Sequence, residues 1–208
     1  IESFSFSSFG VNVSCQVESR GYNFSHALNA LVKGDSSDKE AQKIELLMNM
    51  AGITIADRKV AVEAQKRAKE TGGPAAALEL EDGTIVTGKT TNLLGASAAL
   101  LLNVLKLLAG IDHEVHIISP NSIEPIQKLK VDYLKSKNPR LHTDEVLIAL
   151  SASAAENPQA RLALSQLPKL EGCQAHTSVM LSDVDIKIFK KLGVQLTSEA
   201  VFEHILLS

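Results

Sequence analysis

Residues 75–109 read AAALELEDGTIVTGKTTNLLGASAALLLNVLKLLA, and this stretch decides the fold. Short apolar runs lie on either side of Asp82-Gly83, a pair that is typical of the turn in a β-hairpin. The segment from Ala96 to Ala109 follows, and Asn103 and Lys106 interrupt its apolar residues. A helix with apolar surface on most sides belongs in a protein core. The stretch therefore predicts a hairpin followed by a buried central helix.

Helices and strands are expected to alternate after the central helix. We expect a strand over 114–118, a helix entered through Ser119-Pro120-Asn121, helices capped by Thr143 and Asn157, a strand within 173–181, a helix over 183–192 capped by Ser182 and a short strand over 194–197. A hairpin followed by such an alternation predicts an α/β fold, a three-layer sandwich around a mixed sheet.

The same arrangement is similar to a zinc-deaminase domain whose metal ligands are missing. Zinc deaminases place His/Cys-x-Glu at the start of the first helix and Pro-Cys-x-x-Cys at the start of the second. Here these places hold Gly95-Ala96-Ser97 and Pro120-Asn121-Ser122-Ile123-Glu124. We therefore expect a deaminase-like mixed sheet without zinc and without deaminase chemistry.

Three regions are expected along the chain. Residues 1–24 form an N-terminal arm in which Ser alternates with Phe, a pattern that fits a short strand or an apolar arm. Residues 25–72 form a helical segment, with helices over 26–33, 38–51 and 58–70. The break at Gly72-Gly73-Pro74 separates it from the deaminase-like domain, residues 73–208.

Composition excludes several classes of partner. A net charge of −3 gives no reason to expect nucleic acid or an anionic membrane as a partner, and no apolar run is long enough to span a bilayer. Cys15 and Cys173 lie far apart and belong to no C-x-x-C pair, and no charged-then-apolar leader precedes them. We therefore expect a reduced, cytoplasmic setting. The Phe-rich arm needs a cover, which predicts a homo-oligomer.

The starts of the two central helices are the first candidate for a binding site. In a deaminase-like scaffold without metal, both helix starts still direct unpaired N–H groups and positive dipole ends at one pocket, which suits a phosphate or carboxylate. Short polar groups able to complete such a cradle are Ser97, Ser119, Asn121 and Ser122. Plain helix capping is the alternative role for each of them.

The loop 135–142 is the second candidate. It places Lys135, Lys137, Asn138, Arg140 and His142 within eight residues, which combines anion-binding groups with a general acid/base. Arg140 can hold a phosphate with its planar fork, and His142 is the expected proton-transfer group, the one catalytic candidate. A solvated connector is the alternative.

One further lysine and three of the five remaining histidines bear on ligand or metal binding. Lys89, in Gly88-Lys89-Thr90-Thr91, is a second cation that could neutralise a ligand, although these residues do not make a phosphate loop. His113 and His116 are expected on opposite faces of a strand, and a core position is expected for His176. We therefore expect no metal and no cofactor.

The chain also resembles the C-terminal portion of an uncharacterised bacterial domain-of-unknown-function family. The resemblance rests on Gln42–Asn49, Asp82–Lys89, Leu94–Ser97, Ile118–Pro120, Glu124–Leu129, Ser136–Glu145 and Lys190–Gly193. It covers about four-fifths of the chain and implies a deaminase-like subdomain with a helical appendage, but no known activity. Members are more than twice as long, with an N-terminal half that contains a phosphate-loop-like segment. The resemblance thus implies a missing N-terminal domain.

Two functions remain open from the sequence. The first is a zinc-free deaminase-like domain that binds an anionic small molecule, a nucleotide or a phosphorylated metabolite, as part of a larger enzyme. The alternative is a structural or oligomerisation module whose pocket its own side chains fill. The first predicts an open polar cleft at Gly95 and Asn121, and the second predicts an apolar plug there.

Overall fold

The computed structural model describes residues 46, 49–50, 52 and 57–201, and it has a mixed α/β architecture. Four strands form an open sheet in the order β2-β1-β3-β4. Their bounds are β1 (Ala75–Glu79), β2 (Ile85–Lys89), β3 (Gln174–Thr177) and β4 (Gln195–Ser198). Strand β1 is antiparallel to β2 and to β3, whereas β3 and β4 are parallel. The α/β class predicted from the sequence is therefore confirmed.

The β1–β2 hairpin is confirmed where the sequence placed it. Gly83 occupies the left-handed region with φ +83°, and the Asp82 Oδ1 atom accepts a hydrogen bond from the Thr84 N–H at 2.9 Å. At the far end of β2, a Cβ on Gly88 would lie 2.2 Å from the backbone nitrogen of Leu100. A glycine is needed there because the strand and the following helix touch through their backbones.

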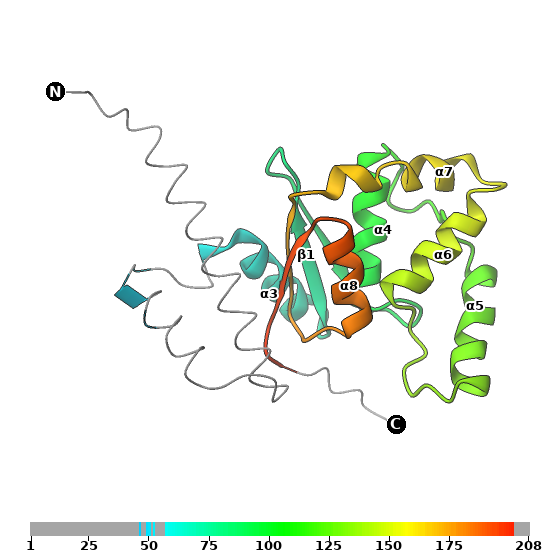
Figure 1. Cartoon of the computed structure of the whole chain (residues 1–208), viewed down its shortest axis with the longest axis horizontal. Helices are drawn as coiled ribbons and strands as arrows, with labels where there is room; N and C mark the ends of the chain where they lie inside the picture. The colour runs from blue at the N-terminus through cyan, green and yellow to red at the C-terminus, as the bar shows by residue number, and fades with distance from the viewer. Residues whose placement is uncertain (1–45, 47–48, 51, 53–56, 202–208) are drawn as a thin grey trace.

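Helices cover both faces of the sheet. On one face lies α3 (Lys59–Thr71), whose Val60 and Ala64 pack on Ala77. On the other face lie α4 (Ala96–Leu108) and α8 (Asp183–Lys191), as Figure 1 shows. The alternate residues Ala76 and Leu78 belong to the core cluster that includes residues of these two helices. This alternation is what period-two strand geometry requires.

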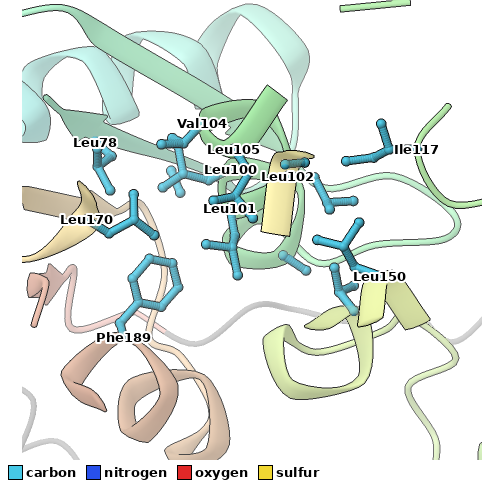
Figure 2. Packing of buried hydrophobic residues seen from close by; sticks show 14 of the residues in the cluster. Leu78, Leu100, Leu101, Leu102, Val104, Leu105, Ile117, Leu150, Leu170 and Phe189 are labelled. Carbon is cyan, nitrogen blue, oxygen red and sulfur yellow. The ribbon is translucent and has the colours of Figure 1, made fainter. Parts of the chain in front are cut away.

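Helix α4 is the buried central helix that the sequence predicted. Figure 2 shows its leucines between Leu78, Leu170 and Phe189 on one side and Ile117 and Leu150 on the other. Its two polar interruptions bind backbone carbonyls. The Asn103 amide donates to the Thr87 carbonyl at 2.9 Å, and the buried Lys106 ammonium donates to the carbonyls of His113 and Val115. Both polar groups are thereby satisfied inside an apolar environment.

The remaining helices pack outside α4 and α8. They are α5 (Pro120–Lys128), the π-helix η2 (Leu129–Tyr133), α6 (Thr143–Ser153), α7 (Pro158–Leu164) and the 3₁₀ helix η3 (Leu167–Leu170). The caps predicted at Asn157 and Ser182 are confirmed, because each side chain accepts hydrogen bonds from the first helical turn. Helix α6 begins one residue earlier than expected, with His142 as its N-cap residue.

The strand predicted over 114–118 is wrong. This segment is irregular, since Lys106 holds the carbonyls of His113 and Val115. The adjacent residues Ile117 and Ile118 are both buried, whereas a strand would direct them to opposite faces. The apolar content that suggested a strand therefore serves to anchor a connection to the core.

The expected N-terminal regions lie almost entirely outside the described residues. These regions are the arm 1–24 and the helices over 26–33 and 38–51; within the last, Leu46, Asn49 and Met50 are helical. Helix α3 confirms the third helix. It packs directly on the sheet, and the buried Arg58 before it donates to Thr197 on β4 and, at 2.6 Å, to Gln174 on β3. The segment just before Gly72-Gly73-Pro74 is thus part of the same packed unit.

Candidate functional site

A cavity of about 290 Å³ lies where the starts of α4, α6 and α8 meet. Helix α4 contributes the first residues after its N-cap, α6 contributes its N-cap His142, and α8 contributes Ser182 and Asp185. The lining residues are Pro74, Thr90, Gly95, Ala96, Ser97, Asn138, Arg140, Leu141, His142, Val179, Met180, Leu181, Ser182 and Asp185.

A short backbone pairing brings the loop 135–142 to the start of α4. The Leu141 N–H donates to the Leu93 carbonyl at 2.9 Å, and the Gly95 N–H donates to the Leu141 carbonyl at 3.2 Å. Beside this bridge, the Arg140 Nε atom donates to the Thr91 carbonyl at 3.0 Å. Backbone hydrogen bonds therefore fix Leu141, and its neighbours Arg140 and His142 both line the cavity.

The central contact of the site joins α6 to α8. The Nδ1 atom of His142 lies 2.9 Å from Oδ2 of Asp185, and the Ser182 hydroxyl donates to the same carboxylate oxygen at 2.7 Å. Oδ1 of Asp185 accepts from the Thr143 N–H at 2.9 Å and from the Thr143 hydroxyl at 2.8 Å. The carboxylate is thus surrounded by donors although Asp185 is only 3% exposed.

These contacts fix the charge of Asp185. Burial opposes ionisation of this carboxyl group, but the hydrogen bonds from His142, Ser182 and the Thr143 backbone outweigh it and lower the pKa of Asp185 to about 2. At neutral pH the group is a carboxylate, so it accepts a hydrogen bond from the Nδ1–H of His142.

The same contact sets the tautomer and basicity of His142. The hydrogen bond to Asp185 raises the pKa of His142 above 6.5, and partial burial opposes this. Since Asp185 holds Nδ1–H, Nε2 is the nitrogen left to exchange a proton with a ligand. A carboxylate that orients an imidazole in this way is a recurrent feature of general acid/base sites.

A largely buried ion pair holds the backbone of the loop 135–142. The Lys130 ammonium, on the π-helix η2, donates to the Arg140 carbonyl at 2.6 Å and to Oε2 of Glu145 at 2.8 Å. Oε2 of Glu145 also accepts from the His142 N–H at 2.8 Å. The backbone of both lining residues is therefore held by one lysine–glutamate pair.

Ser97 is a buried polar residue of the cavity wall. It is 2% exposed and lies in the first turn of α4, and its hydroxyl has no hydrogen-bond partner among the described residues. The N-cap Gly95 offers no side chain, so no side-chain cap binds the N–H groups of this turn. Both features leave donors at the cavity wall.

The structure brings together four of the ten candidate residues named from the sequence. These four line the cavity: Ser97, Asn138, Arg140 and His142. The other six do not: Lys89, Ser119, Asn121, Ser122, Lys135 and Lys137. Lys89 is exposed at the end of β2, and Ser119 caps α5 by accepting from the Asn121 N–H at 3.3 Å. The second helix start at the cavity belongs to α8, with α6 as a third, rather than to α5.

Several residues of this site were not assigned to it from the sequence. Asp185, Ser182, Thr143, Lys130 and Glu145 carry the network, yet only Ser182 and Thr143 were expected, as helix caps. One available signal was Glu145 at the third position after His142, which marks a capping interaction. No local signal pairs Asp185 with His142, because the two are 43 residues apart.

Other titratable groups lie away from the cavity. On the α3 face of the sheet, the buried His176 contacts Thr197 Oγ1 at 2.8 Å through Nδ1 and Glu199 Oε1 at 3.1 Å through Nε2. His113 and His116 are exposed on the irregular connection. Among the residues that the structure describes, no three His, Cys, Asp or Glu side chains are grouped to hold a metal ion. Within the same residues, no helix has the length and apolar character needed to cross a membrane.

Residues 56–207 match the family described as "Domain of unknown function DUF1846, C-terminal". The chain belongs to this family. A UPF0371 protein of Corynebacterium urealyticum is 56% identical over 165 residues, which are 79% of this chain and 33% of the relative. A UPF0371 protein of Corynebacterium glutamicum is 49% identical over 196 residues, 93% of this chain and 40% of the relative. One from Streptococcus pneumoniae is 50% identical over 168 residues, 81% of this chain and 34% of the relative. This DUF1846 domain thus spans between a third and two-fifths of the length of these relatives.

Proposed function

We propose that this DUF1846 C-terminal domain binds a small anionic molecule in the cavity, and that His142 exchanges a proton with it. The observation that carries the proposal is the His142–Asp185 contact at 2.9 Å on the cavity wall. A nearly buried carboxylate that orients a half-buried imidazole combines a fixed tautomer with a pKa raised above 6.5. These are the properties of a general acid/base near neutral pH.

The anionic character of the ligand follows from the part of the cavity wall formed by the start of α4 and by Arg140. The first turn of α4 has N–H groups that no side chain caps, and the positive end of a 13-residue helix dipole lies there. Arg140 lines the same cavity and adds a guanidinium group. A protonated His142 would further favour an anion.

A structural role is the second candidate, and one observation favours it. Asp185 bonds the backbone N–H and the hydroxyl of Thr143, so the same carboxylate joins the starts of α6 and α8 without any ligand. In the structural-module alternative, Asp185 serves only to hold these two helix starts together. It predicts that His142 contributes to stability but responds to no anion.

Thermal unfolding in increasing inorganic phosphate separates the two candidates. Binding to the folded state alone raises the midpoint with ligand concentration. We expect this rise in the wild-type chain and in Lys89→Gln, and its loss in Arg140→Gln. Lys89 is the matched control because it is an exposed cation that directly precedes the lining residue Thr90 but does not itself line the cavity. Equal responses of Lys89→Gln and Arg140→Gln would contradict the proposal.

Three wider proposals accompany this function. The sheet and its helices derive from a deaminase-like scaffold, the domain works within a longer protein, and it self-associates. The length of the relatives supports the second. Sedimentation of the chain tests the third, and the function proposed for the cavity depends on none of them.

A further inference from the structure

The cavity also carries information about the class of its ligand. We propose that it takes a small, non-aromatic phosphate ester, of the size and chemistry of a sugar or polyol monophosphate, rather than a nucleotide. This inference rests on the function proposed above and narrows it to one class of anion.

The chemistry of the wall disfavours a nucleobase. None of the described lining residues is Phe, Tyr or Trp, so no described side chain offers an aromatic ring of that kind for a base to stack on. The apolar part of the wall is non-aromatic and consists of Pro74, Ala96, Leu141, Val179, Met180 and Leu181. Only the His142 imidazole and the Arg140 guanidinium remain as stacking partners among the described lining residues, and the proposed function assigns both to the anion and its proton.

The size of the cavity favours a compact ligand. A volume of about 290 Å³ lies just below the range of roughly 300–1,000 Å³ that is usual for small-molecule sites. A cavity of this size suits a compact monophosphate better than a larger ligand.

Hydrogen-bonding groups line the cavity at two places. Ser97 presents a hydroxyl without a described partner beside the uncapped turn of α4, where we place the phosphate. Asn138, Thr90 and Ser182 line the same cavity, and Ser182 Oγ lies 3.4 Å from His142 Nδ1. Groups that donate and accept suit the hydroxyls of a polyol, and a hydroxyl also carries a proton that His142 Nε2 could exchange.

Isothermal titration calorimetry of the 208-residue chain with five probes tests this. The probes are inorganic phosphate, ribose, ribose 5-phosphate, AMP and gluconate. We expect ribose 5-phosphate to bind about tenfold more tightly than inorganic phosphate, and AMP to bind no more tightly than ribose 5-phosphate. Gluconate, a carboxylate of similar size, should bind more weakly than ribose 5-phosphate.

A variant of the wall makes the test specific to this cavity. Ser97→Ala should weaken ribose 5-phosphate binding about tenfold, because a hydrogen bond to a charged group is lost. Ser151→Ala, at an exposed position of α6, should leave it unchanged. AMP binding tenfold more tightly than ribose 5-phosphate would overturn this inference and leave the proposed anion site standing. Tighter binding of gluconate, or equal effects of the two serine variants, would also overturn it. Absence of binding by every probe at millimolar concentration would overturn both proposals.

Discussion

His142 and Asp185 meet at 2.9 Å between the starts of two helices that are far apart in the sequence. The contact joins the N-cap of α6 to the first turn of α8 and lies on the wall of the cavity. It therefore has two separable consequences, one for stability and one for chemistry.

Replacing the carboxylate should destabilise the fold. In Asp185→Asn, the amide cannot accept all the hydrogen bonds that His142, Ser182 and Thr143 donate, and we expect a loss of about 3 kcal/mol in the free energy of unfolding. Urea unfolding measures this. Asp132→Asn, at an exposed position of η2, is the control and should change stability by less than about 0.5 kcal/mol. Similar losses in both variants would mean that the loss in Asp185→Asn does not come from the hydrogen bonds of this carboxylate.

Stability should depend on pH in two separate windows. The pKa of Asp185 falls from 3.8 to about 2 on folding, so the stability it contributes is complete above about pH 4 and is lost as the pH falls through about 2. The pKa of His142 is raised above 6.5, so its contribution is complete below pH 6.5 and is lost as the pH rises through the raised value.

Unfolding free energies measured across this range check the alkaline window. We expect the decline above pH 6.5 to disappear in His142→Gln and to persist in His113→Gln, whose side chain is exposed on the irregular connection. A decline of the same size in both variants would show that another group causes it.

Central packing on α4 gives a prediction independent of the site. Leu101 is 1% exposed and Leu107 is 49% exposed on the same helix. We expect Leu101→Ala to cost about 3 kcal/mol because it opens a cavity, and Leu107→Ala to cost less than about 0.5 kcal/mol. Chemical denaturation of both variants is the measurement. A small effect at Leu101 would contradict the core described for α4.

The close contact of β2 with α4 gives a further prediction about stability. In Gly88→Ala the added Cβ would lie 2.2 Å from the Leu100 nitrogen, so the strand and helix must separate. We expect a loss of about 2 kcal/mol in the free energy of unfolding. Gly73→Ala is the matched control, because nothing lies within 4 Å of its added Cβ. Equal stability of the two variants would contradict the close approach.

Local sequence patterns were enough to predict much of the fold. The hairpin at Asp82-Gly83, the buried helix after Gly95 and the caps at Asn157 and Ser182 all follow from short-range chemistry that the structure repeats. The segment 114–118 misled because burial of Ile117 and Ile118 comes from tertiary anchoring, which leaves no periodic signal.

The site was predictable only in part. Ser97 and the loop residues Asn138, Arg140 and His142 meet at the cavity, because the Leu93–Leu141 pairing brings the loop to the start of α4. Asp185 could not be assigned, since its position beside His142 depends on how α8 packs against α6. The start of α5 was chosen by analogy with a deaminase, and its polar residues lie elsewhere.

The most direct test of the central claim is an NMR titration of the His142 ring, with and without inorganic phosphate. We predict a pKa above 6.5 in the free chain and a further rise in phosphate, because an anion at the start of α4 favours the imidazolium. A pKa of 6.5 or below, unchanged by phosphate, would contradict the account.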